Sequence, residues 1–274
     1  MAARSATSMR VRAGDGQPQG GFTALVTSLP GLIIARLLIL AVFLLFWEYA
    51  SGTLISRFWV SAPSAIFGML VTWFTDGSIW PHLEATLLAM GVGYLIGCGL
   101  GVGCGLMLGF LPMVQRIVMP YVSGLYALPK IALAPLLVII LGIDIPSKIA
   151  LVAITTMFLL LYSTLDGIRD VDRDLVQTLR LMGATRAEII RKVLIPATLP
   201  WIFTGMRVAV RYAFTAAVLG ELIAANQGVG YLIEANAGLY DATGVFAGVF
   251  IIVVFSVAMT ELLTRVEGRR APPA

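Results

Sequence analysis

Long apolar blocks are the feature of this 274-residue chain that most restricts its fold. A helix needs about 20 mostly apolar residues to cross the hydrocarbon of a bilayer. Within that hydrocarbon every backbone N–H and C=O must find its partner inside its own segment, so the blocks must be helices. We therefore expect an all-α membrane protein with about six transmembrane helices. The expected spans are residues 32–50, 84–110, 117–141, 145–165, 201–225 and 244–264. Pro129 and Pro135 are expected to kink the third of these spans.

The composition of 59% hydrophobic and 12% charged residues supports this class, because soluble domains carry roughly 25% charged residues. A net charge of +4 could indicate a nucleic-acid partner. Basic residues beside membrane spans mark the cytoplasmic side, however, so we expect the lipid bilayer and no nucleic acid as partner. We interpret residues 1–30 as a disordered cytoplasmic tail and residues 31–268 as one transmembrane domain.

The distribution of Lys and Arg predicts which side of the membrane each loop faces. Basic residues gather before the first span, after the second, between the fourth and fifth, and after the last. This bias marks the cytoplasmic side, and an even number of spans places both termini there. We therefore expect a multi-pass protein with both termini cytoplasmic. The residues assigned to that side are Arg4, Arg10, Arg12, Arg36, Arg116, Arg169, Arg173, Arg180, Arg186, Arg191, Lys192, Arg265, Arg269 and Arg270.

Glycine recurs at every fourth residue in the second expected span. This spacing places the glycines on one face of a helix, where a second backbone can approach closely. Because glycine is unfavourable in an isolated helix, a packing contact must compensate for it. That contact is either ordinary helix packing within one subunit or a surface that slides during a functional cycle. The glycines are Gly93, Gly97, Gly101, Gly105 and Gly109.

The most informative segment lies between the fourth and fifth expected spans, at residues 172–196. Its apolar residues follow the helical period in two short runs. Gly183 separates the runs and suits the left-handed position just after a helix end. Thr185 and Glu188 have the spacing of a capping box that opens the second helix. The segment is therefore predicted to form two short amphipathic helices.

Pro196 and Pro200 are expected to end the second short helix before the fifth span, because proline lacks the N–H that a helix needs. Two capped helices joined by a glycine could dock into a groove on another protein. Alternatively, the basic face with Arg186, Arg191 and Lys192 could lie on anionic lipid headgroups. The residues alone leave both interpretations open.

This segment resembles the cytoplasmic EAA loop of permease subunits of ATP-binding-cassette (ABC) importers. In that loop a glycine is followed ten residues later by an apolar residue and then x-(Ile/Leu)-Pro. Gly183, Val193 and Pro196 occupy these positions here. The Glu-Ala-Ala triplet of the pattern is Gln177-Thr178-Leu179 in this chain. This departure puts the usual acidic contact in doubt and leaves the docking role in place.

Further stretches extend the resemblance over roughly residues 30–268, toward permeases for nitrate, taurine and aliphatic sulfonates. It implies the type I importer permease fold and a place in the bacterial inner membrane. The stretches are Ser61-Ala62-Pro63-Ser64, the run from Leu128 to Pro135, Gly167-Ile168-Arg169, Gly220-Glu221 and Gly228-Val229-Gly230-Tyr231.

The resemblance implies a non-catalytic subunit that works with other chains. These are a second permease copy, two ATPase subunits and a soluble extracytoplasmic solute-binding protein. ATP and Mg²⁺ would be bound by the ATPase, since this chain has no G-x-x-x-x-G-K-[ST] stretch. We expect no cofactor in the chain itself. The residues expected to couple to the ATPase are Gln177, Gly183, Ala184, Thr185, Arg186, Glu188 and Arg191.

Charged residues inside spans are candidates for function because they are costly in lipid. We expect Lys130, Arg207, Arg211 and Glu221 to line the translocation pathway. A positive lining would suit a small anionic solute, such as nitrate, taurine or a sulfonate. Arg207 and Arg211 could instead extend to the headgroups.

Two other classes of protein are alternatives. An ion-coupled secondary transporter would need buried acidic carriers and repeated broken helices, and the span interiors offer little beyond Glu221. An intramembrane protease would need a catalytic pair inside the spans. The aspartates lie at span ends or in loops, and the single histidine, His82, is expected outside the spans. We therefore assign neither catalytic residues nor a metal site.

Overall fold

The computed structural model describes residues 29–268, and every regular element in this range is helical. The predicted all-α class is confirmed. The expected disordered tail at residues 1–30 falls almost entirely outside the described residues. Contacts divide the chain into one unit that ends at Ile55 and a second that begins at Ser56.

The first unit contains helix α2, Leu29–Thr53. Residues Gly31–Thr53 are long and apolar enough to cross a bilayer. The side chains of Ile39 and Leu45 are 71% and 70% exposed. An apolar helix that exposes such side chains is suited to face lipid.

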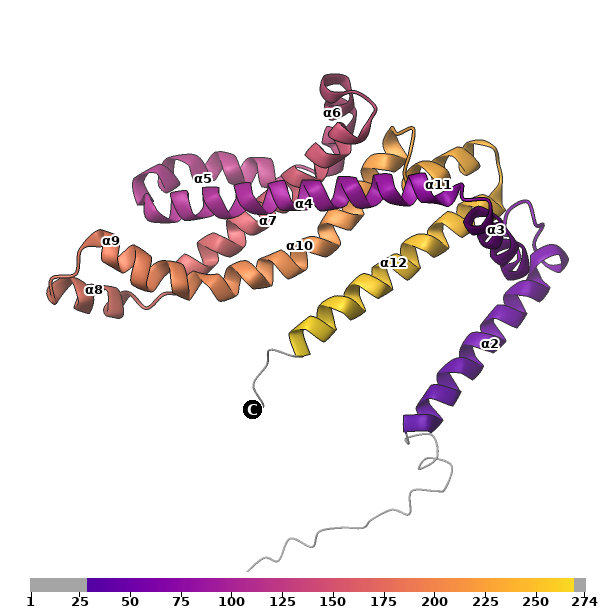
Figure 1. Cartoon of the computed structure of the whole chain (residues 1–274), viewed down its shortest axis with the longest axis horizontal. Helices are drawn as coiled ribbons and strands as arrows, with labels where there is room; N and C mark the ends of the chain where they lie inside the picture. Colours follow the sequence, from indigo (N-terminus) through magenta and orange to yellow (C-terminus); the bar gives the residue numbers. More distant parts are fainter. Residues whose placement is uncertain (1–28, 269–274) are drawn as a thin grey trace, which may run out of the picture. The chain divides into compact units, whose positions relative to one another are not determined.

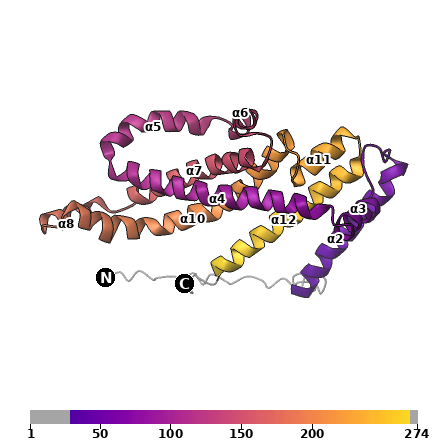
Figure 2. The same cartoon turned by 45° about the horizontal axis from the view of Figure 1, so that its top comes forward.

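The core of the second unit consists of three long helices, α4 (Ile79–Phe110), α7 (Ile145–Arg169) and α10 (Ile195–Ile223). They run side by side in both views (Figure 1, Figure 2), with α7 packed against α4 and α10. Small and apolar side chains fill the contacts, among them Val152 and Ala213, which are fully buried. The candidate sites described below lie on this bundle or on the segments that join its helices.

The glycine stripe of α4 faces α7. A Cβ atom built on Gly93 would lie 2.6 Å from the Cβ of Val152, and one on Gly105 would lie 2.6 Å from the Cβ of Thr164. A Cβ on Gly99, which lies off the stripe, would have nothing within 4 Å. The stripe therefore forms a close helix contact within one subunit, and whether this contact also slides during a functional cycle stays open.

The third expected span is bent. Helix α5 (Pro112–Ala127) is followed by η1 (Lys130–Leu133) and α6 (Ala134–Leu141), at an angle of 87° across the break. Pro129 causes the break, as expected, because the residue before a proline is driven out of the helical conformation. The expectation that Pro135 also bends the span was wrong. Pro135 lies in the first turn of α6, where its missing N–H is not needed.

Three further helices of the second unit are α3 (Pro63–Thr75), α11 (Val229–Gly238) and α12 (Ala242–Gly268). Both α3 and α11 pack against α12. Five helices among the described residues are long and apolar enough to cross a bilayer, and the bent pair brings the total to six. The expected number of about six spans is confirmed.

The expected stop at Pro196 and Pro200 is wrong. The chain stays helical from Arg186 to Ile223, through α9 (Arg186–Ile189), the π-helical turn η2 (Ile190–Leu194) and α10. Pro196 follows the π-helical turn in the first turn of α10, where a missing N–H is tolerated. Pro200 is accommodated inside α10.

At 1.5 Å per residue this 38-residue helix is about 57 Å long. It far exceeds the roughly 30 Å of hydrocarbon. Its charged first part, Arg186–Leu194, therefore extends out of the membrane. The second short helix and the fifth span therefore form one continuous helix.

Candidate functional site

The coupling segment, residues 172–194, comprises α8 (Arg173–Leu181), the turn at Gly183, α9 and η2. It extends beyond the ends of α4 and α7 (Figure 1). Asp172 caps α8, and its carboxylate accepts the Asp174 N–H at 2.8 Å. Gly183 has φ +88°, and the N–H of Ala184 donates to the carbonyl of Leu179 at 3.0 Å. The predicted left-handed glycine after α8 is confirmed.

The predicted capping box is also confirmed. The N–H of Thr185 donates to Oε2 of Glu188 at 3.0 Å, and the N–H of Glu188 donates to Oγ1 of Thr185 at 3.3 Å. Lys192 forms an ion pair with Glu188, at 3.0 Å. The Thr185 N–H, followed by the Lys192 ammonium, lowers the pKa of Glu188 to about 2. The start of the second helix is therefore set by residues within one turn of it.

Arg186 connects the coupling segment to the bundle. Its guanidinium donates to the carbonyl of Phe110, the last residue of α4. A cation at a helix C-terminus satisfies an unpaired carbonyl and complements the helix dipole. Ile189 is buried and Arg191 is exposed. The second helix is amphipathic as predicted, and Arg186 holds its start against α4.

The most exposed apolar side chains of the coupling segment lie just before Gly183. Leu181 is 89% exposed and Met182 is 79% exposed. Leu181 was not predicted from the sequence as a site residue. The available signal was its position beside the hinge, because a large apolar side chain at an exposed turn is a candidate contact. Gln177 is exposed on the same short helix.

Lys130 lies in η1, at the break of the third span. Its ammonium lies 4.0 Å from the centroid of the Tyr126 ring and donates to the Tyr126 carbonyl. Such a cation–π contact holds the charge in place. Lys130 lines a pocket of about 140 Å³ together with Tyr212 and Thr215 of α10.

Arg211 belongs to the same part of α10 as this pocket. It is exposed, and its carbonyl accepts the Thr215 hydroxyl at 3.0 Å. Arg207 lies one turn earlier and is partly buried. The structure thus brings Lys130 to the same region of α10 as Arg211.

Glu221 lies elsewhere, at the centre of what we call the Glu221 cluster. This carboxylate is 2% exposed. Its Oε2 accepts the Thr86 hydroxyl at 3.0 Å and the Gly230 N–H at 2.9 Å. The Thr86 hydroxyl also accepts the N–H of Val229 at 3.0 Å. Glu221 therefore faces the interior of the subunit and is not part of the pocket that Lys130 lines.

His82 completes the Glu221 cluster. Its Nδ1 accepts the Gly228 N–H at 3.1 Å. His82 lies in the first turn of α4, which begins at Ile79, and its expected place outside the membrane stays a prediction. Sequence reasoning missed Thr86 and His82, since no motif links them to the turn after α10. The cluster fastens that turn to α4.

Lys148 is a second buried charge near the same end of the bundle. It is 4% exposed, and its ammonium donates to the carbonyls of Ile143 and Asp144, the latter at 3.2 Å. The Asp144 carboxylate accepts the Asn226 amide at 2.8 Å. These contacts attach the start of α7 to the turn after α10.

Comparison with known proteins identifies the family to which this chain belongs. A family model described as "Binding-protein-dependent transport system inner membrane component" matches residues 97–271. The taurine transport system permease protein TauC of Escherichia coli strain K12 is 32% identical over 83% of this chain and 84% of that protein. The formylaminopyrimidine transport permease protein ThiX of Halalkalibacterium halodurans is 29% identical, over 82% of this chain and 90% of that protein.

A solved structure shows the same fold. A chain of the inward-facing MetNI methionine ABC transporter superposes with a TM-score of 0.60 at 19% identity, covering 73% of this chain and 97% of that one. The type I importer permease fold is thus confirmed. This chain belongs to the family of inner membrane components of binding-protein-dependent transport systems, as a multi-pass, non-catalytic permease subunit of an ABC importer.

Proposed function

We propose that this permease subunit carries a small anionic solute of the nitrate, taurine or sulfonate kind. Two copies would flank the pathway, and an extracytoplasmic binding protein would deliver the solute. A separate ATPase, which binds ATP and Mg²⁺, would drive transport through the coupling segment on the cytoplasmic side, where both termini also lie. The observation that carries the choice of solute is the position of Lys130.

Lys130 places a positive charge in a fixed position at a pocket. The Tyr126 ring and carbonyl orient its ammonium, and the remaining N–H donors are available to an anion. Arg211 adds a second exposed cation on α10. Arg207 belongs to the same helix, so we assign all three cations to the pathway. Glu221 was expected there too, but its buried hydrogen bonds support a structural role instead.

The coupling segment supports the proposed contact with an ATPase. Leu181 and Met182 form an exposed apolar tip, which suits insertion into a groove of a partner. Gln177 and the Gly183-Ala184 hinge flank this tip. Because α9 continues into α10 without a break, a displacement of the tip would reach the bundle through a rigid helix. Glu188 and Thr185 keep the start of that helix intact, and Arg191 lies exposed on it.

The test is uptake by the reconstituted complex of permease, ATPase and binding protein, with taurine, nitrate and a neutral pyrimidine as solutes. We expect ATP-dependent uptake of an anion. Lys130→Met should lower that uptake roughly tenfold, because hydrogen bonds to charged groups contribute about 1.5–3 kcal/mol. Lys130→Arg keeps the charge and should retain most of the activity.

Two results would contradict the proposal. Uptake by the permease alone, driven by an ion gradient, would point to a secondary transporter. Equal uptake by the Met and Arg variants would remove Lys130 from the pathway.

A further inference from the structure

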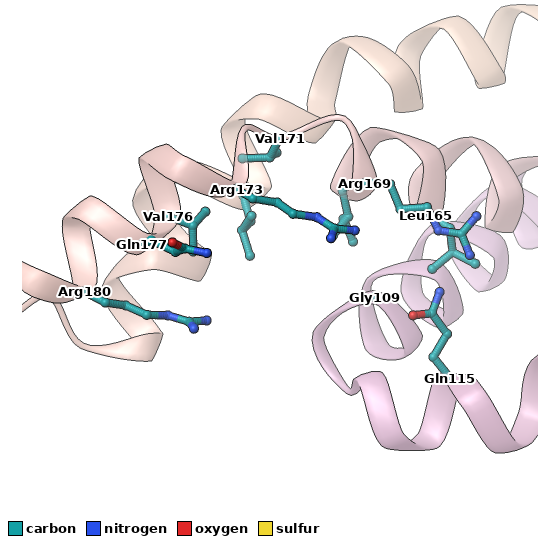
Figure 3. Close-up of a pocket in the computed structure, with 11 residues that line it drawn as sticks. Gly109, Gln115, Leu165, Arg169, Val171, Arg173, Val176, Gln177 and Arg180 are labelled. Atoms are coloured by element: carbon teal, nitrogen blue, oxygen red, sulfur yellow. The ribbon is translucent and has the colours of Figure 1, made fainter.

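A second pocket lies at the base of the coupling segment, and Gln177 is the one expected coupling residue that lines it. We call it the basic pocket. It has a volume of about 330 Å³ and is lined by the ends of α4 and α7, the first turn of α5, α8 and the last residue of η2. Figure 3 shows Arg173, Gln177 and Arg180 extending from α8 on one side, with Gln115 opposite. Arg169, the last residue of α7, completes the polar lining.

The charges of this pocket are unbalanced. Three guanidinium groups line it, from Arg169, Arg173 and Arg180, and no carboxylate does. Arg169 is paired with Asp166 at 3.6 Å. Within the part of the chain that the structure describes, Arg173 and Arg180 have no ion-pair partner. Like charges gathered in one pocket repel each other, so an anion bound there would be stabilised.

The donors suit a phosphate group in particular. Guanidinium groups present a planar fork of N–H donors that matches the oxygens of a phosphate. The amides of Gln115 and Gln177 add neutral donors at two sides of the same space. A volume of about 330 Å³ lies within the range of small-ligand pockets.

The rest of the lining is apolar and lies at the ends of the spanning helices. Leu165 and Ile168 come from the last turns of α7, and Gly109 from the last turn of α4. The ends of spanning helices mark the level of the lipid headgroups. A ligand here would meet arginines on the α8 side and apolar helix ends on the other. An anionic lipid has this combination of charged head and apolar chain.

We propose that the basic pocket binds the phosphodiester of an anionic lipid headgroup and thereby bridges α8 to the ends of α4 and α7. A carboxylate of the ATPase is the less favoured occupant. The exposed tip at Leu181 and Met182 lies at the far end of α8, whereas the pocket is walled by the last turns of the spans. Basic pockets at this level between spanning helices are suited to anionic headgroups.

The test measures lipid retained by the full-length permease in nanodiscs that contain equal amounts of phosphatidylglycerol and phosphatidylcholine. Native mass spectrometry after extraction counts the lipids that remain bound. We expect phosphatidylglycerol to be enriched. The double variant Arg173→Gln and Arg180→Gln should lower its retention about tenfold.

The matched control is Arg36→Gln together with Arg116→Gln. It removes the same charge from exposed positions that do not line the pocket. Simple attraction between a basic surface and an anionic bilayer is worth about 1 kcal/mol per basic residue wherever it lies near the surface. It therefore predicts equal losses in the two double variants, whereas a built site predicts a loss only for Arg173 and Arg180.

Four results would overturn the proposal. They are equal retention of the two lipids, equal losses in the two double variants, displacement of the lipid by millimolar inorganic phosphate, and unchanged lipid retention with weakened ATPase binding in the Arg173/Arg180 variant. The third would identify a free phosphate as the ligand, and the fourth a protein carboxylate. A thermal midpoint within about 2 °C of the parent would show that the variants are folded.

Discussion

The coupling segment and the Glu221 cluster each depend on a glycine with positive φ, but they are built in different ways. At the coupling segment, the turn at Gly183 and the capping box join residues only three to five apart in the sequence. At the Glu221 cluster, the bonds from Thr86 and His82 to Glu221, Gly228 and Val229 join residues 135 to 146 apart. The first region forms from its neighbours along the chain, and the second exists only once the bundle has assembled.

The two glycines show the same contrast. A Cβ built on Gly183, at φ +88°, would have nothing within 4 Å. A Cβ built on Gly228, at φ +122°, would collide with the carboxylate of Glu221. The coupling segment is therefore tolerant of added atoms and free to contact a partner. The Glu221 cluster is closed, and a change there must disturb the packing of α4, α10 and the turn between α10 and α11.

Gly228→Ala is expected to have the largest effect. The left-handed conformation alone costs a non-glycine residue about 1–2 kcal/mol, and moving Glu221 would break its buried hydrogen bonds at about 1–3 kcal/mol each. We expect a loss of several kcal/mol in folding stability, measured as the thermal midpoint in nanodiscs. Gly183→Ala is the matched control and should show only the backbone strain. Equal losses in both variants would remove the proposed difference between the two regions.

Glu221→Leu should have the second largest effect. The change leaves the Gly230 N–H without its acceptor and leaves the Thr86 hydroxyl only the His82 carbonyl. An unsatisfied buried donor costs about 1–3 kcal/mol. Glu221→Gln keeps an oxygen at this position and should lose less. A thermal midpoint for Leu at or above that of the parent would show that burial of the carboxylate costs more than these hydrogen bonds contribute.

Gly183→Val should separate transport from stability. A β-branched residue at a positive φ costs about 1–2 kcal/mol, and the strain would be confined to the turn between α8 and α9. We expect a near-normal thermal midpoint of the bundle with a large loss of ATP-dependent uptake in the reconstituted complex. Full uptake together with full solute-stimulated ATPase activity would contradict the coupling role of this turn.

Thr185→Ala should have the smallest effect. Loss of an N-cap side chain costs about 1 kcal/mol, here at the start of a rod that continues into α10. We expect a modest decrease in uptake, with Thr185→Ser close to the parent because serine retains the hydroxyl. Hydrogen exchange at the first amides of α9 would measure the fraying directly. Unchanged exchange in the Ala variant would show that Arg186, through its bond to Phe110, is sufficient to hold the helix start.

The sequence by itself determined the elements whose cause is local. Apolar length gave the spans, because a backbone in lipid can satisfy its hydrogen bonds only as a helix. The spacing of Thr185 and Glu188 gave the capping box, and Gly183 gave the end of α8, because both depend on residues within one helical turn. The break at Pro129 was predictable for the same reason.

The tertiary structure decided where those elements meet. The spacing of the glycines in α4 defined a face, but only the bundle shows that α7 covers it. Pro196 carries a local signal to stop, which the π-helical turn before it overrides. From the sequence, Glu221 is a charged residue within a span. The structure shows that it is buried and that its hydrogen bonds join α10 to α4 and to the first turn of α11. Contacts such as that between Thr86 and Glu221 join residues far apart in the sequence and depend on how whole helices pack. They therefore cannot be predicted from any short stretch of sequence.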